Sequence, residues 1–154
     1  MKKAFALSIL AVIVVGCGAG KPGIVGDWDV SGLDAPGMPS GSKATMAFQD
    51  KDFNLTFKMS QNGPTGKPIN LTMIYGGTYE VKGEDLTMKF TSFDAKSDDA
   101  AVQKMLEGSL AAGKQTMLDN MNKTNSGKLA WDGEDKVTMK SKNNQDLVLV
   151  RVKK

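Results

Sequence analysis

Hydrophobic and polar residues alternate one by one over most of the chain after residue 24, which predicts amphipathic β-strands with one buried face. Short runs rich in glycine, asparagine or aspartate separate these segments, as turns do. Gly76 and Gly77 interrupt one segment without changing its alternation, and they predict a bend within a single strand. The pattern predicts eight strands, over residues 27–31, 43–49, 53–60, 69–81, 86–90, 129–131, 137–139 and 147–152.

The period changes between the fifth and sixth predicted strands, where apolar residues recur every three to four positions and predict a helix. Ser97, Asp98 and Asp99 mark its start, because a capping side chain and acids favour the first turn. Gly108 and Gly113 each cost about 1 kcal/mol relative to alanine, and they predict a bend or a break. The apolar face of this helix, residues 98–121, comprises Val102, Leu106, Leu110, Met117 and Met121, with Met105 and Leu118 at its margins.

An acidic turn that leads into an amphipathic strand occurs three times in the chain. The segments 83–89 and 133–140 are the closest pair, and 52–58 is a looser third copy. Their short length indicates a repeated hairpin rather than a solenoid. They lack the density of oxygen ligands that an EF-hand calcium loop needs.

Eight short antiparallel strands joined by hairpin-length turns predict a mostly β fold. The favoured architecture is a closed or nearly closed barrel with one helix between strands five and six. The alternative is a two-sheet β-sandwich. Closure removes exposed strand edges, and an eight-stranded barrel can be filled by side chains or can hold one small ligand.

The first seventeen residues carry the three parts of an export signal. Lys2 and Lys3 give a basic start, residues 4–15 form an apolar run, and a small residue precedes Cys17. The apolar run is shorter than the roughly 20 residues that a transmembrane helix needs. We therefore predict a signal peptide over residues 1–16 rather than a membrane span.

The segment Val14-Val15-Gly16-Cys17 resembles the lipobox of bacterial lipoproteins. The resemblance implies that the Cys17 thiol takes a diacylglyceryl group, that cleavage precedes this cysteine, and that the new amine is acylated, for example with palmitate. Two or three acyl chains anchor a protein firmly, because each buried CH₂ contributes about 0.8 kcal/mol. Residues 17–23 would form a lipidated tether and residues 24–154 the folded domain. A residue other than aspartate after the cysteine implies, by the family's sorting rule, the outer membrane facing the periplasm if the cell is Gram-negative.

The tripeptide Gly26-Asp27-Trp28 resembles the Gly-x-Trp opening of lipocalins and of lipocalin-like bacterial domains. In that family the tryptophan closes one end of the barrel and an arginine from the last strand packs over it. The resemblance gives these roles to Trp28 and Arg151, in a cation–π contact. If the valines of the last strand face inward, however, Arg151 faces outward. The family's Thr-Asp-Tyr motif is absent, and lipocalins place their helix after the eighth strand.

Composition excludes several kinds of chemistry. The chain has no histidine, which excludes Ser-His-Asp and Cys-His catalysis and histidine metal sites. Carboxylate acid–base chemistry and carboxylate Mg²⁺ or Ca²⁺ sites remain open, but no motif favours them, and we expect no cofactor and no metal. The formal net charge of +3 includes Lys2 and Lys3, so the processed chain lacks the basic character of a nucleic-acid binder. Cys17 is the single cysteine, so packing and strand pairing must stabilise the domain.

Aromatic and methionine side chains dominate the predicted inward positions. Methionine would make a pocket pliable, and tyrosine hydroxyls would orient the polar end of a ligand. The same side chains equally fit a solid core in which methionine fills gaps. The candidate ligand-binding residues are Trp28, Phe48, Phe57, Met73, Tyr75, Tyr79, Met88, Phe90 and Met139.

Together these features favour a non-enzymatic envelope lipoprotein, anchored to the membrane through Cys17, that binds a small apolar ligand inside its barrel. The alternative is a structural or protein-interaction module of the envelope. Such a module would present a sheet face or the loop 32–41 to a protein partner that the sequence does not identify. The helix over residues 98–121 would either cover the core or act as a lid.

Overall fold

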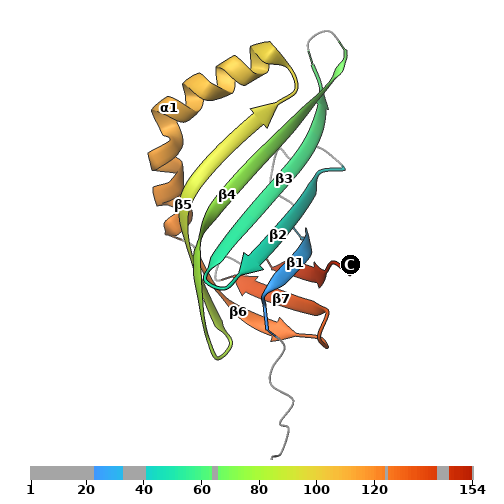
Figure 1. The fold of residues 1–154 in the computed structure, drawn as a ribbon, viewed down its shortest axis with the longest axis vertical. Helices are drawn as coiled ribbons and strands as arrows, with labels where there is room; N and C mark the ends of the chain where they lie inside the picture. The colour runs from blue at the N-terminus through green and yellow to red at the C-terminus, as the bar shows by residue number, and fades with distance from the viewer. Residues whose placement is uncertain (1–22, 33–40, 64–65, 124, 142–145, 154) are drawn as a thin grey trace, which may run out of the picture.

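A computed structural model describes residues 23–32, 41–63, 66–123, 125–141 and 146–153. Within these ranges the chain forms eight strands and one helix, and the strands close into a single antiparallel barrel (Figure 1). Each strand pairs with its neighbours in sequence, and β1 pairs with β8 to complete the ring. The predicted eight-stranded barrel is confirmed, and so is the position of its helix between the fifth and sixth strands.

The strands differ in length, so the barrel is tall on one side and short on the other. The three strands β3, β4 and β5 extend well above the others in Figure 1. Strand alternation predicted β2 at its observed bounds and placed the others within a few residues, except that β5 is much longer and β6 begins earlier. The elements are β1 (Gly26–Ser31), β2 (Lys43–Gln49), β3 (Asp52–Asn62), β4 (Pro68–Lys82), β5 (Asp85–Ser97), α1 (Ala100–Asn122), β6 (Ser126–Trp131), β7 (Lys136–Ser141) and β8 (Leu147–Arg151).

The bend predicted at Gly76 and Gly77 is a β-bulge. The pairing of β4 with β5 shifts register between these two glycines and leaves Thr91 as the extra residue. A β-carbon on Gly77 would clash with the carbonyl oxygen of Lys89, so only glycine fits there. The extra residue changes the phase of the alternation, which is why the pattern ended the predicted strand at residue 90. The inward side chains of β5 are Leu86, Met88 and Phe90 before the bulge, and Phe93 and Ala95 after it.

Helix α1 begins at the predicted place but uses its two aspartates differently. Asp99 is the N-cap, and its carboxylate accepts hydrogen bonds from the backbone N–H groups of Ala101 and Val102. The Asp98 carboxylate instead accepts hydrogen bonds from the backbone N–H of Asn70 at 2.9 Å and from its side-chain amide at 2.6 Å. Asp98 therefore ties the start of the helix to β4.

The predicted apolar face of α1 is only partly buried. Leu118, which the periodicity placed at the margin, is buried, whereas Met117 is 40% exposed and Met105 is 72% exposed. The placement of Met117 on the packed face was wrong because one periodicity was continued past Gly108 and Gly113, although these glycines predicted a bend. Figure 1 shows α1 changing direction between its two halves, and Gly108 and Gly113 lie near its middle.

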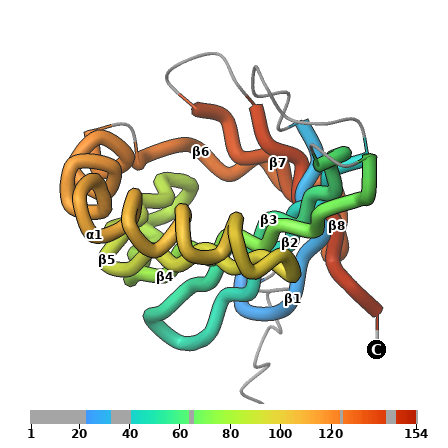
Figure 2. The backbone as a smooth tube through the Cα atoms, turned by 90° about the horizontal axis from the view of Figure 1, so that it is seen from above, coloured from blue at the N-terminus to red at the C-terminus, as the bar shows by residue number. Residues whose placement is uncertain are grey.

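Helix α1 covers the upper part of β5 along the edge where its pairing with β6 stops, while the other edge stays paired with β4. Among the described residues, β5 pairs with β6 only over residues 85–87. Above them, the Asn122 side-chain amide accepts a hydrogen bond from the Phe90 N–H and donates one to the Phe90 carbonyl oxygen. Figure 2, a view from above, shows the helix beside β5 with β1 and β8 on the far side of the barrel. The helix thus replaces a neighbouring strand along this edge.

The predicted signal peptide, the lipidation site Cys17 and nearly all of the tether 17–23 lie outside the described residues. So does most of the loop 32–41. None of the helices that the structure describes is both long and apolar enough to cross a bilayer.

Candidate functional site

One end of the barrel gathers most of the short turns. The β2–β3, β4–β5 and β6–β7 turns meet there, together with the start of β1 and the end of β8. We name it the lower end, after its position in Figure 1. The three acidic turns that the sequence repeats before β3, β5 and β7 all lie at this end.

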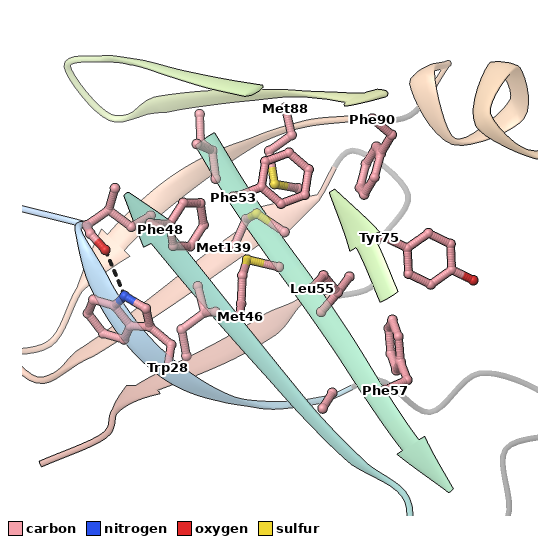
Figure 3. Close-up of a cluster of buried hydrophobic side chains, with 14 of the residues drawn as sticks. Trp28, Met46, Phe48, Phe53, Leu55, Phe57, Tyr75, Met88, Phe90 and Met139 are labelled. Atoms are coloured by element: carbon pink, nitrogen blue, oxygen red, sulfur yellow. Dashed lines mark hydrogen bonds between the residues drawn. The ribbon is translucent and has the colours of Figure 1, made fainter. Parts of the chain in front are cut away.

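The nine candidate residues come together in one hydrophobic cluster. Seven of them are buried, while Met73 and Tyr79 remain partly exposed. Figure 3 labels the seven buried candidates and shows them interleaved with other core side chains, such as Phe53 and Leu55. Phe53 and Phe90 meet edge-to-face at 5.0 Å between ring centroids, and Tyr75 stacks on Phe93 at 4.5 Å. Side chains in such contact occupy space that a ligand would need, so these residues form a packed core. Their role in ligand binding stays a prediction.

Trp28 and Arg151 form the contact that the lipocalin resemblance implies. The Trp28 side chain is fully buried, and its indole N–H donates a hydrogen bond to the Ile24 carbonyl oxygen at 2.7 Å (dashed in Figure 3). The guanidinium carbon of Arg151 lies 4.2 Å from the centroid of the Trp28 ring. The same guanidinium donates hydrogen bonds at 2.8 Å to the carbonyl oxygens of Val25 and Gly23.

The orientation of Arg151 follows from the face that β8 buries. Leu149 is fully buried, whereas Val150 is 44% exposed. Arg151 shares the face of Leu149, so it points toward Trp28. The alternative in which the valines face inward and Arg151 faces outward is therefore wrong, because a strand that is apolar on both faces does not reveal by its sequence which face is buried.

A hollow of about 660 Å³ opens at the lower end, beside the Trp28–Arg151 pair. Asp52 pairs with Thr78, so the last residues of β4 extend past the β2–β3 turn and form one wall of this hollow. The rim carries the charged side chains of Asp50, Lys51 and Glu80. The apolar part of the lining comprises Ile24, Tyr79, Val81, Leu129 and Trp131.

Two aromatic side chains connect the hollow to the core. The Tyr79 ring meets Phe48 edge-to-face at 4.9 Å, and the Trp131 ring meets Trp28 edge-to-face at 6.0 Å. Burial, and then the nearby Asp50 charge, raise the pKa of the Tyr79 hydroxyl above its ordinary value. The hydroxyl therefore stays protonated at neutral pH and can donate a hydrogen bond to a polar group in the hollow.

Sequence reasoning identified only part of this lining. Tyr79 was among the nine predicted ligand residues, but Ile24, Leu129 and Trp131 were not. A usable signal existed for Trp131, because it directly precedes one of the acidic turns, and Tyr79 also lies shortly before one. Residues just before similar turns of a barrel lie at the same end of it.

The described part of the chain shows no arrangement typical of metal chemistry. Within it, no group of three or more histidine, cysteine, aspartate or glutamate side chains is placed to hold a metal ion. Of the charged residues at the rim of the hollow, Asp50 and Lys51 are neighbours in the β2–β3 turn, and Glu80 lies on β4. Such an arrangement can attract and orient a ligand.

Comparison with known proteins adds no relative to these observations. No family model matches the chain, and a search of curated proteins finds no match. Function is therefore inferred from the fold and from the hollow at its lower end.

Proposed function

We propose that this chain is a membrane-anchored lipoprotein of the cell envelope that binds a small apolar ligand and catalyses no reaction. The hollow at the lower end of the barrel carries the proposal. Its volume of about 660 Å³ falls within the range of roughly 300–1,000 Å³ that is typical of small-molecule sites. Its lining combines apolar side chains with a few polar groups, as such sites do.

The ligand is assigned to the mouth of the barrel and not to its centre. Phe48, Phe53 and Phe90 are buried and in contact with other aromatic rings in the core. At the mouth, by contrast, Tyr79 and Trp131 are partly exposed and face open space. Barrel mouths are common ligand sites because the surrounding strands hold the lining rigidly.

The proposed anchor and the proposed ligand site belong to the same end of the domain. Gly23, the last residue of the predicted tether, lines the hollow. The six residues from Cys17 to Pro22 span at most about 20 Å when fully extended. A lipid on Cys17 would thus keep the hollow close to the membrane surface, where apolar molecules are concentrated.

A neutral apolar dye, N-phenyl-1-naphthylamine, tests the binding proposal. The sample is the full chain carrying Cys17→Ser, which removes the thiol that would take the lipid. We expect saturable fluorescence enhancement with one site per chain. Val81→Lys, at a partly exposed position in the hollow, should weaken binding by about tenfold, because an ammonium group in the hollow opposes an apolar ligand.

Met105→Lys on α1 is the matched control, because Met105 is exposed and distant from the hollow in sequence. It should leave the affinity unchanged. Dye fluorescence that rises without saturation, or equal weakening by both variants, would remove the proposal.

Metabolic labelling with an alkyne analogue of palmitate tests the anchor. We expect label on the wild-type chain and none on Cys17→Ser. The mass of the processed wild-type chain should match a lipidated chain that begins at Cys17. Label that persists in the variant, or a wild-type chain cleaved elsewhere, would contradict the assignment of Cys17.

A further inference from the structure

Carboxylates outnumber basic groups on the rim of the hollow. Asp50 and Glu80 face a single lysine, Lys51, among the lining residues. The Asp50 charge is close enough to Tyr79 to act on its hydroxyl, so the field of this carboxylate reaches into the hollow. Asp50 lies in the β2–β3 turn, where its backbone φ is 28°.

The acidic character continues around the lower end. The turns before β5 and β7 contribute further carboxylates, including Asp85 and Glu134. Several of the basic groups at this end are already engaged with acids. Lys82 pairs with Glu80 at 2.9 Å. The other such contacts join Lys136 to Asp132 and both Arg151 and Lys153 to Asp135.

Aromatic side chains line the hollow beneath this rim. Tyr79 and Trp131 belong to β4 and β6, which approach the hollow from different sides. Aromatic rings attract cations through their quadrupole, and tryptophan does so most strongly. An apolar body with a positively charged amine would therefore be favoured by the rings and by the surrounding carboxylates together.

From these contacts we infer that the hollow at the lower end prefers an apolar ligand that carries a positively charged amine. This inference rests on the proposed function, because it names the chemical class of the ligand at the same site. The apolar lining takes the body of the ligand, and Asp50 with the aromatic rings takes its charge. An anionic ligand of the same shape is disfavoured, since it would meet the Asp50 carboxylate and the electron-rich faces of the rings, while Glu80 is paired with Lys82.

Three naphthalene probes of similar size separate shape from charge. They are (1-naphthylmethyl)trimethylammonium, neutral 1-ethylnaphthalene and anionic 1-naphthylacetate, each titrated into the full chain carrying Cys17→Ser. We expect the cation to bind about tenfold more tightly than the anion, with the neutral probe between them. The preference for the cation should shrink at a high salt concentration of about 0.5 M NaCl, because the dissolved ions screen exposed charges.

Asp50→Asn removes the charge and keeps the shape, and asparagine tolerates the positive φ at this position. We expect it to reduce the ratio of cation affinity to anion affinity about threefold. Glu107→Gln on α1 is the matched control, because it removes the same charge far from the lower end. Perturbed NMR signals of the Trp131 indole and the Tyr79 ring should locate all bound probes at the hollow.

The outcomes separate the charge preference from the proposed function. If all three probes bind equally, or the anion binds best, the charge preference is overturned and the apolar site survives. If none of them binds, both proposals fall. Perturbations centred on core residues such as Phe57 instead of Trp131 would overturn the location.

Discussion

The strand edges at the lower end of the barrel and the edge along the upper part of β5 are covered in different ways. At the lower end, pairing runs from β1 through β8 and back to β1, so each strand supplies the hydrogen-bond partners of the next. Along the upper part of β5, the Asn122 side-chain amide makes hydrogen bonds with the backbone N–H and carbonyl oxygen of Phe90. The side-chain oxygen of Gln103 accepts a hydrogen bond from the Ser97 N–H. A helix covers this edge at separate points, whereas a strand pairs continuously.

The two regions should therefore differ in local stability. A buried backbone group needs a partner, and a single side chain provides it only while its helix stays in place. Leu118 is the one buried residue of α1. Regions with few buried contacts open more readily than the core of a domain. We expect the upper part of β5 to exchange its amide hydrogens faster than the ring of strands below it.

The largest expected effect breaks the lower end. Trp28→Ala removes a fully buried ring, its hydrogen bond to Ile24 and the contact with Arg151. We expect a loss of about 3–5 kcal/mol in the free energy of unfolding, measured by urea denaturation. Met105→Ala on the exposed side of α1 should change this free energy little. A loss below about 1 kcal/mol for Trp28→Ala would show that the stability of the barrel does not depend on the Trp28 side chain.

The next effect separates the two regions. Asn122→Ala leaves the Phe90 N–H and carbonyl oxygen without their side-chain partner. We expect a loss of about 1–3 kcal/mol and faster hydrogen exchange at Phe90, with little change around Trp28. Asn120→Ala is the matched control, because the exposed Asn120 side chain accepts a hydrogen bond from the Lys123 ammonium at the same end of the helix. Equal acceleration of exchange at both ends would show that the barrel opens as one unit.

A smaller effect strengthens the upper region. A β-carbon at Gly108 or Gly113 would meet nothing within 4 Å, so close packing does not require either glycine. Each alanine should stabilise α1 by up to about 1 kcal/mol, observed as slower exchange in the helix and along β5. Gly77→Ala is the contrasting control and should destabilise, because its β-carbon meets the Lys89 backbone. Destabilisation by Gly108→Ala or Gly113→Ala would indicate that the bend in α1 needs glycine.

The smallest expected effect concerns the tie between α1 and β4. Hydrogen bonds from the Asn70 backbone, and then from its side chain, hold the pKa of the Asp98 carboxyl below its ordinary value of 3.8. A lowered pKa in the folded state means that the carboxylate stabilises the fold at neutral pH. This contribution is lost as the pH falls below about 4 and through the lowered pKa.

An NMR titration of the Asp98 carboxyl carbon measures this pKa directly. Asn70→Ala should move it part of the way back to 3.8, because the side-chain hydrogen bond is lost while the backbone one remains. An Asp98 pKa at or above 3.8 in the wild-type chain would contradict the tie.

Local sequence patterns by themselves determined the β-strands and the start of the helix, and they favoured a barrel over a β-sandwich. Alternation with a period of two specifies which residues of a strand share a face, and the cap at Asp99 depends only on its immediate neighbours. The bend at Gly76 and Gly77 was visible for the same reason, because glycine inside a strand marks a local irregularity.

Only the tertiary structure decided which faces and ends meet. The bulge shifts the phase of β5 and brings Phe93 into the core, and the bent helix buries Leu118 in place of Met117. The hollow joins Ile24, Tyr79 and Trp131 from three separate segments of the chain. Their proximity depends on the register of strand pairs around the barrel, which no local periodicity contains, because register is set by contacts between residues far apart in sequence.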